Sequence, residues 1–329
     1  MTTDDERDAR MTLAAASEPA DIITGTLVKR LGASEALALV DSRTALPSDI
    51  DPAEGELWRR RLASRVTPGE NERIQRRMEQ HELRMITPGD QRWPAELSQL
   101  GPSEPLAIWI RGDIAPLNVP LEQRVAMTGA RASTSYGDRM AADIAADLAG
   151  RGKVIVTGGA YGIDAAALRS ATDIAPGHAI AVLAGGLDLP YPSGHHDFFA
   201  HVTDAGGLLL SELPPGTAPT KWRFLQRGRL VAVLGSATIV VEAGRRSTSL
   251  HIAGFAHALG RPVGAVPGPL TSVASAGAHR LIQDGIASLV VNAADIIELT
   301  DPAARYAAGR PFAYSHARRS RLVGTGIGR

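Results

Sequence analysis

Two copies of one local pattern, between Arg124 and Asp164, restrict the fold of this chain more than any other feature. In each copy a short apolar run, 125–127 and then 154–156, ends in Thr-Gly, and a turn of small residues leads into a helical pattern. A strand, a glycine turn and a helix together form an anion site in α/β proteins, because backbone N–H groups and the helix N-terminus face the ligand. Two such units on parallel strands predict two phosphate-sized sites at one edge of a sheet.

The composition excludes several kinds of site. The chain has 329 residues and no cysteine, so disulfides, thiolate metal sites and cysteine nucleophiles are excluded. Its 35 basic and 35 acidic residues cancel, so any surface that binds nucleic acid must be local. There is no apolar run long enough to span a membrane, and the acidic start MTTDDERDAR does not resemble a signal peptide. We therefore expect a soluble, cytoplasmic protein that does not contact a membrane.

Regular alternation of strand and helix patterns begins at residue 124. Apolar runs predict strands at 124–128, 153–157, 179–183, 207–211, 237–241, 263–266 and 288–291. Helical patterns between them cover 137–150, 164–173, 195–203, 222–234, 247–260 and 275–284. Continuous apolar strands are typical of a sheet covered on both faces, and the alternation implies right-handed crossovers. The fold class predicted is α/β, with an extended Rossmann-like, doubly wound, mainly parallel sheet.

The rest of the chain divides into further segments. Residues 1–82 predict a small helical N-terminal domain with a frayed start, in which two helices flank Gly32. The segment with this helix-hairpin-like pattern either contacts a DNA backbone or is only a small helical packing module. We expect residues 83–300 to form the Rossmann-like domain, which begins with a connector and an edge strand at 106–110. Residues 301–329 predict a flexible tail with six arginines, which either adds phosphate affinity or only solubilises the chain.

The two glycine turns supply the first candidate binding residues. Gly129 allows the backbone to approach an anion, and Arg131 offers a planar fork to phosphate oxygens. The hydroxyls of 133–135 either contact the ligand or cap their own helix. In the second turn, TGGAYGID, Gly158 and Gly159 allow a close backbone approach.

Neither turn matches a known cofactor loop. The second turn lacks the Lys of a phosphate-binding P-loop, and it does not have the G-x-G-x-x-G spacing of a dinucleotide site. We therefore expect no nicotinamide cofactor, and we interpret Asp164 as a helix cap rather than a catalytic group. His195 and His196 lack the third ligand that a metal site needs, so no metal is expected.

A basic and aromatic segment, KWRFLQRGR at 221–229, is the strongest candidate for binding nucleic acid. It carries four positive charges and no acid, in Lys221, Arg223, Arg227 and Arg229, with Phe224 among them. Cations contact phosphates, and an aromatic face accepts an unpaired base. The alternative is a helix that buries Phe224 and Leu225 and leaves its arginines in water.

Taken in order, these turns resemble the DNA-processing protein A (DprA/Smf) family over about residues 83–300. The family motif G-x-R with Tyr-Gly matches Gly129, Arg131, Tyr136 and Gly137. The next two motifs match Thr157, Gly158, Ala160, Gly162, Ile163 and Asp164, then Leu183, Gly186, Asp188, Tyr191 and Pro192. The remaining motifs match Ser211, Glu212, Pro214, Gly216, Pro219, Phe224, Arg227, Arg229, Glu242, Ala243, Ser247, Ser249, Leu250, Pro267 and Gly268.

The resemblance implies a protein that binds single-stranded DNA without catalytic turnover or a cofactor. It also implies protection of incoming DNA in natural transformation, loading of the RecA recombinase and assembly as a homodimer. DNA-pocket residues of the family correspond to Gly129, Arg131, Lys221 and Phe224. We expect the wall of the same DNA pocket to include Gly158, Gly159, Arg227 and Arg229.

The resemblance also has departures. The chain has Leu225, Gly228 and Thr248 where the family has Pro, Asn and Gly, and an arginine-rich tail in place of a winged-helix domain. A divergent member is therefore expected.

Two other functions remain open from the sequence. One is a nucleotide-processing enzyme similar to the phosphoribohydrolases, although 242–250 reads EAGRRSTSL and lacks the P-G-G-x-G-T-x-x-E motif of that group. The other is a regulator that binds only small nucleotides.

Overall fold

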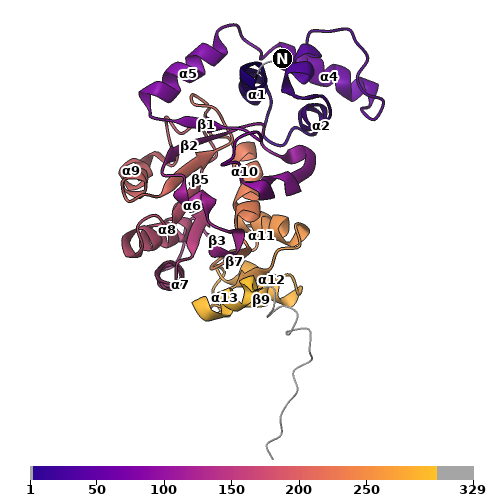
Figure 1. The fold of residues 1–329 in the computed structure, drawn as a ribbon. Helices are drawn as coiled ribbons and strands as arrows, with labels where there is room; N and C mark the ends of the chain where they lie inside the picture. Colours follow the sequence, from indigo (N-terminus) through magenta and orange to yellow (C-terminus); the bar gives the residue numbers. More distant parts are fainter. Residues whose placement is uncertain (1–2, 302–329) are drawn as a thin grey trace, which may run out of the picture.

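A nine-stranded sheet forms the centre of the molecule, and the computed structural model describes residues 3–301 of the chain (Figure 1). The strand order is β1-β2-β6-β5-β4-β3-β7-β8-β9. Strands β3 to β9 are parallel, whereas β1 and β2 form an antiparallel addition beside β6. The strands are β1 Arg84–Ile86, β2 Ile108–Gly112, β3 Arg124–Thr128, β4 Val154–Thr157, β5 Ala179–Val182, β6 Leu208–Ser211, β7 Ala237–Val240, β8 Val263–Ala265 and β9 Ser288–Leu289. The predicted doubly wound, mainly parallel sheet is thus confirmed.

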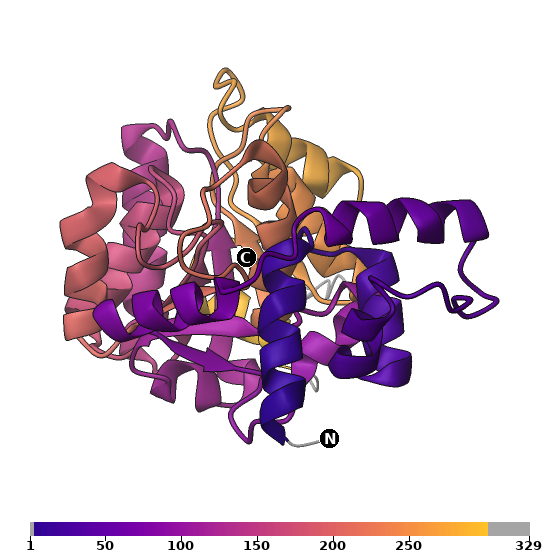
Figure 2. The same ribbon diagram turned by 90° about the horizontal axis from the view of Figure 1, so that it is seen from above.

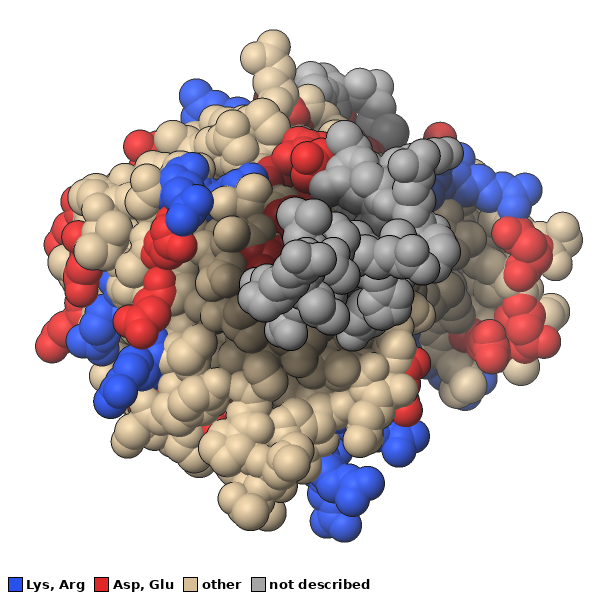
Figure 3. Space-filling model, turned by 90° about the horizontal axis from the view of Figure 1, so that it is seen from below, with Lys and Arg blue, Asp and Glu red and all other residues tan. Residues whose placement is uncertain are grey.

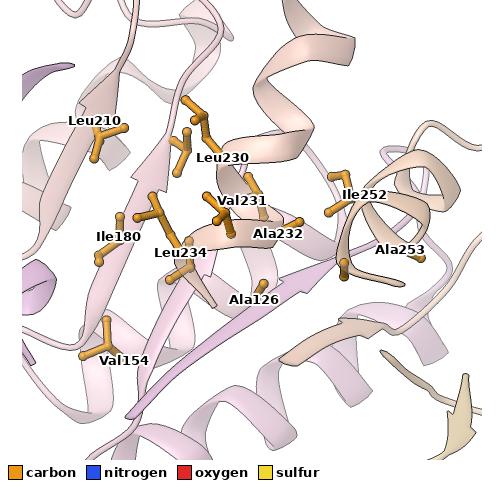
Figure 4. Packing of buried hydrophobic residues seen from close by; sticks show 14 of the residues in the cluster. Ala126, Val154, Ile180, Leu210, Leu230, Val231, Ala232, Leu234, Ile252 and Ala253 are labelled. Carbon is orange, nitrogen blue, oxygen red and sulfur yellow. The ribbon is translucent and has the colours of Figure 1, made fainter. Parts of the chain in front are cut away.

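Helices cover both faces of this sheet. The helices that follow its parallel strands are α7 Ser135–Gly150, α8 Ile163–Ile174, α9 His196–Asp204, α10 Lys221–Leu234, α11 Ser249–Ala258, α12 Ala276–Gln283 and α13 Ala293–Thr300. Alternate residues of β3 point to opposite faces, so Val125 packs with α7 and α8, and Ala126 packs with α10 and α11. Figure 4 shows Leu230, Val231 and Leu234 of α10 against the strands.

The order of the strands reverses beside β3. From β3 the chain adds β4, β5 and β6 on one side, and α10 then returns it to β7 on the other side of β3. In open α/β sheets, ligands bind beyond the carboxyl ends of the strands at such a switch point. The turn that follows β3 therefore lies where this fold places a ligand.

In the part of the chain that the structure describes, five helices precede the edge strand β1. They are α1 Thr3–Ala16, α2 Ile22–Leu31, α3 Ala33–Ala38, α4 Pro52–Ala63 and α5 Glu70–Gln80. They lie together at the end of the molecule near β1 and β2 (Figures 1 and 2). Gly32 separates α2 from α3, as the sequence predicted, with a φ of 91°.

The prediction of a frayed start is wrong. Helix α1 begins at Thr3, and Met11 is buried in the same hydrophobic cluster as Trp109 of β2. The carboxylate of Glu6 accepts hydrogen bonds from the backbone N–H groups of Ala33 and Ser34 at the start of α3. This acidic segment is ordered because a distant helix N-terminus supplies its partner.

The connector after residue 83 also differs from its prediction. The expected edge strand at 106–110 is observed as β2, but β2 lies second from the edge. The outer position belongs to β1, which has only three residues and gives little pattern in the sequence. Short turns of 3-10 helix, at Ala95–Ser103 and Leu121–Gln123, fill the rest of the connector. A further 3-10 turn, Ser193–His195, precedes α9, and the four-residue helix α6 covers Ala115–Asn118.

The surface carries mixed charge. On the face that Figure 3 shows, lysine and arginine are interspersed with aspartate and glutamate. Among the helices of residues 3–301, none combines the length and the apolar character that crossing a membrane requires. The predicted tail at 301–329 falls, apart from Asp301, outside the described residues.

Candidate nucleic-acid interface

The turn after β3 is held against its neighbours by backbone contacts. The N–H of Ala130 donates to the carbonyl oxygen of Glu242, at the end of β7, over 2.6 Å. A Cβ on Gly129 would lie 2.7 Å from that same oxygen, so only glycine allows this approach. The turn then presents the exposed side chain of Arg131 beyond the carboxyl edge of the sheet.

Arg131 meets an aromatic residue from the first turn of α10. Its guanidinium carbon lies over the ring of Phe224, 4.6 Å from the ring centroid. Tyr191 contacts the same ring edge-on, with centroids 5.6 Å apart. Lys221 begins α10 and is exposed, three residues before the half-buried Phe224 and therefore on the same side of the helix. We call Arg131, Lys221, Phe224 and Tyr191 the Arg131–Phe224 site.

The hydroxyl of Thr220 accepts a hydrogen bond from the N–H of Arg223 and fixes the start of α10. Within residues 3–301, the charged groups of Arg131 and Lys221 make no hydrogen bond or ion pair. Both cations are thus available to an anionic ligand.

Arg227 lies behind this site rather than at its surface. It is 5% exposed, its Nη1 donates to the carbonyl oxygen of Val182 over 2.8 Å, and its guanidinium carbon is 5.9 Å from the Phe224 centroid. Burial lowers the pKa of Arg227, and the nearby charge of Asp164 partly opposes this shift. Arg227 therefore supports Phe224 from the interior and does not face a ligand.

The anion position of the second glycine turn is filled by the protein itself. The carboxylate of Asp164 accepts from the N–H of Gly158 over 3.0 Å and from the hydroxyl of Thr128 over 3.1 Å. The N–H of Gly159 is bound by the hydroxyl of Thr157 at 3.1 Å. The N–H groups of Gly158 and Gly159 are consequently not free to bind a phosphate, contrary to the role expected for these two glycines.

The N-terminus of α7 is filled in the same way. Glu242 accepts from both the N–H and the hydroxyl of Thr134, each over 2.8 Å. The Thr134 hydroxyl also accepts from the N–H of Gly137, and a Cβ on Gly137 would lie 2.4 Å from the Glu242 carboxylate. Of the two readings left open for these hydroxyls, Thr134 therefore acts as the helix cap.

Arg229 does not join the site. It is 2% exposed, and its two terminal nitrogens pair with the two oxygens of Glu212 at 2.6 and 2.5 Å. Its Nε donates to the carbonyl oxygen of Ser103 in the connector. Arg229 follows Arg227 by two residues on α10, but its side chain points away from the Arg131–Phe224 site and holds α10 to the connector. The expectation that Arg229 lines the binding wall thus disagrees with its position.

Sequence reasoning missed the role of Tyr191 in this site. The tyrosine lies in the loop after β5 and is 45% exposed, although its ring touches Phe224. The only signal was its place in a motif of the resembled family.

Ion pairs fasten the N-terminal helices beside the same loops. Arg77 of α5 binds Asp188 at 2.6 Å, and Arg223 of α10 binds Glu18 at 2.9 Å. Asp188 also accepts from the N–H of Gly216, so it joins two loops to α5. In the described part of the chain, no three His, Asp or Glu side chains are grouped so that they could hold a metal ion.

Comparison with known proteins agrees with this architecture. A family model described as DNA recombination-mediator protein A matches residues 84–301. A sequence named as DNA processing protein DprA in Mycobacterium tuberculosis is 46% identical over 238 residues, which cover 69% of this chain and 60% of that protein. DNA processing protein DprA of Bacillus subtilis is 36% identical over 194 residues, covering 59% of this chain and 64% of that protein. The chain thus spans less than two thirds of these relatives.

Two solved structures share the fold. DNA processing protein A from Streptococcus pneumoniae superposes with a TM-score of 0.71 and 26% identity, over 90% of this chain and 98% of that one. The protein from Helicobacter pylori, whose structure is described by its single-stranded DNA binding mode, gives a TM-score of 0.59 and 30% identity, over 66% of this chain and 94% of that one. Because the family model matches more than half of the sequence, the chain belongs to the DNA recombination-mediator protein A (DprA) family.

Proposed function

We propose that this chain binds single-stranded DNA at the carboxyl edge of its sheet, without catalytic turnover. The observation that carries the proposal is the Arg131 guanidinium over the Phe224 ring at 4.6 Å, with Lys221 on the same side of α10. Cations beside an aromatic face match the two features that a single strand exposes, which are phosphates and unpaired bases. The relative from Helicobacter pylori, described by its single-stranded DNA binding mode, supports this assignment.

The energies of the two contacts suggest how the site takes its ligand. A cation over an aromatic ring at an exposed site contributes about 0.5–1 kcal/mol. A base stacked on an aromatic side chain contributes about 1–3 kcal/mol. A base therefore displaces the Arg131 guanidinium from Phe224, and Arg131 then contacts the adjoining phosphate together with Lys221.

A duplex satisfies this site less well than a single strand. Its bases are already stacked and paired, so Phe224 has no free base face to receive. The carboxylates of Glu212 and Glu242, which follow β6 and β7, and of Asp164, in the first turn of α8, are already bound to the protein's own groups. The side chains of the Arg131–Phe224 site are cations and rings, which bind a strand but do not hydrolyse it.

The test is fluorescence anisotropy with a labelled oligo-dT, a duplex of equal length and the variant R131A/K221A. We expect the double variant to bind oligo-dT at least tenfold more weakly than the wild type. A matched control is R151A/K153A, because both residues precede β4 and lie at the opposite edge of the sheet. Equal affinity of R131A/K221A and wild type, with both folded, would refute the proposal.

Two other results would favour the alternatives. A thermal shift with mononucleotides but none with oligo-dT would indicate a nucleotide-binding regulator. Release of a free base from a nucleoside monophosphate would indicate an enzyme similar to the phosphoribohydrolases.

Membership of a recombination-mediator family supports a wider role. In this role the protein protects incoming DNA during natural transformation, loads RecA onto it and works as a homodimer. Light scattering gives the oligomeric state, and RecA filament formation on strands coated with a single-strand-binding protein tests the loading. A monomer, or no gain in filament formation, would remove that part of the proposal.

A further inference from the structure

Tyr161, in the turn between β4 and α8, is an exposed ring with a fixed orientation. The residue is 47% exposed. One edge of the ring contacts His195, with centroids 4.4 Å apart and an angle of 72° between the planes. An aromatic side chain that is held in place and yet open to water resembles a preformed binding surface more than a core residue.

His195 itself is immobilised, so it is a firm support for Tyr161. It is 7% exposed, and its Nδ1 lies 3.1 Å from the carbonyl oxygen of Gly159, to which it donates. Its ring also meets Phe198 and Phe199 edge-on, at 5.4 and 5.7 Å between centroids. The orientation of Tyr161 is therefore set before any ligand arrives.

Contacts on either side connect Tyr161 to the Arg131–Phe224 site. The next residue, Gly162, is packed so closely that a Cβ would lie 2.6 Å from the carbonyl oxygen of Arg131. The Tyr161 hydroxyl would lie 2.5 Å from a Cβ on Gly194, in the loop that carries Tyr191. Tyr191 in turn meets Phe224. Three loops thus bring Tyr161 to the same rim of the sheet.

We propose that Tyr161 is a second base-stacking surface of the single-stranded DNA site. A strand whose first base lies on Phe224 continues past Arg131 to the turn after β4, where a following base stacks on Tyr161. The inference rests on the proposed function. It extends that function to Tyr161, which is not among the residues that match the family motifs.

The test compares Y161A, Y161F and Y161L on oligo-dT and on an otherwise equal strand of abasic sites. We expect Y161A and Y161L to bind oligo-dT roughly five- to 150-fold more weakly than the wild type, and Y161F to bind like the wild type. On the abasic strand all four proteins should bind alike, because there is no base to stack. The dependence of affinity on salt should be the same in all four, since no phosphate contact is lost.

The matched control is I174A, at the other end of α8, where Ile174 is 58% exposed. This substitution removes exposed apolar surface from the opposite edge of the sheet, and I174A should bind oligo-dT with the affinity of the wild type. If Y161A lost the same affinity for oligo-dT and for the abasic strand, the loss would not come from a base contact, and that result would overturn the stacking role. So would wild-type affinity of Y161A for oligo-dT.

The controls also separate this inference from the proposed function. If F224A and R131A/K221A lose affinity while Y161A does not, only the second stacking surface is wrong. If none of these variants loses affinity, the proposed function fails as well.

Discussion

Gly158 and Arg227 are in direct contact in the interior, behind the Arg131–Phe224 site. A Cβ on Gly158 would lie 1.7 Å from Nη1 of Arg227, far inside any allowed distance. The same nitrogen donates to the carbonyl oxygen of Val182. The glycine turn after β4 is therefore shaped to hold a buried arginine and the nearby, oppositely charged Asp164, rather than an external phosphate.

The first prediction is that Gly158→Ala destabilises the protein by about 2–4 kcal/mol, because the new methyl group displaces a buried charged hydrogen bond. Urea unfolding at constant pH measures the loss. Gly254→Ala is the control, since Gly254 is exposed in α11 and a Cβ there meets nothing within 4 Å. That change should raise stability by about 0.5–1 kcal/mol. Equal stability of the two variants would contradict the contact.

The second prediction concerns salt. Each phosphate neutralised on a single strand contributes a slope of about 0.7 in log affinity against log salt concentration. Replacing Arg131 and Lys221 with Gln should thus lower the slope by about 1.4, if each contacts one phosphate. Titrations of oligo-dT at several salt concentrations measure it. An unchanged slope would mean that neither cation contacts the DNA backbone.

The third prediction is that Arg229→Met unfolds more easily than the wild type but keeps its DNA affinity. Removing one partner leaves Glu212 buried and unpaired, which costs about 3–5 kcal/mol. The double variant R229M/E212L should recover most of this loss, because no charge is then left buried. Chemical unfolding and anisotropy on the folded fraction give the two quantities. A weaker affinity of folded R229M for oligo-dT would indicate that Arg229 does contribute to DNA binding.

The fourth prediction is a loss of stability on acidification that depends on His195. Burial lowers the pKa of His195 below its usual value of 6.5, and the charge of Arg169 lowers it further, whereas the bond to Gly159 and the charge of Asp164 raise it. The unfolded chain therefore takes up a proton first, so stability from this group is complete above about pH 6.5 and falls at lower pH.

Unfolding measured between about pH 7.5 and about pH 5.5 tests this expectation. His195→Asn keeps an N–H donor toward Gly159 without the titrating ring, so its stability should change less with pH than that of the wild type. His257→Asn, at an exposed position of α11, should leave the dependence unchanged. If the stability of H195N changed with pH as steeply as that of the wild type, groups other than His195 would cause the effect.

The sequence predicted the parallel sheet because its strands are continuous apolar runs separated by helical patterns, and both signals are local. It also predicted that Arg131 and Phe224 share a site, and the structure brings these side chains into contact. Strand β1 gave too short a pattern to be recognised. Helix α1 was misread because the partner of Glu6 lies in α3.

The sequence alone thus determined how strands and helices alternate along the chain after residue 124, and it placed glycine turns at one edge of the sheet. Only the tertiary structure decided which charged groups of those turns remain for a ligand. Arg227 and Arg229 stand two residues apart in one basic run, yet both are buried, whereas Arg131 is exposed. The difference arises from distant residues, since Asp164 and Glu212 supply the opposite charges. A buried charge requires such a partner, and the partner is brought close only by folding.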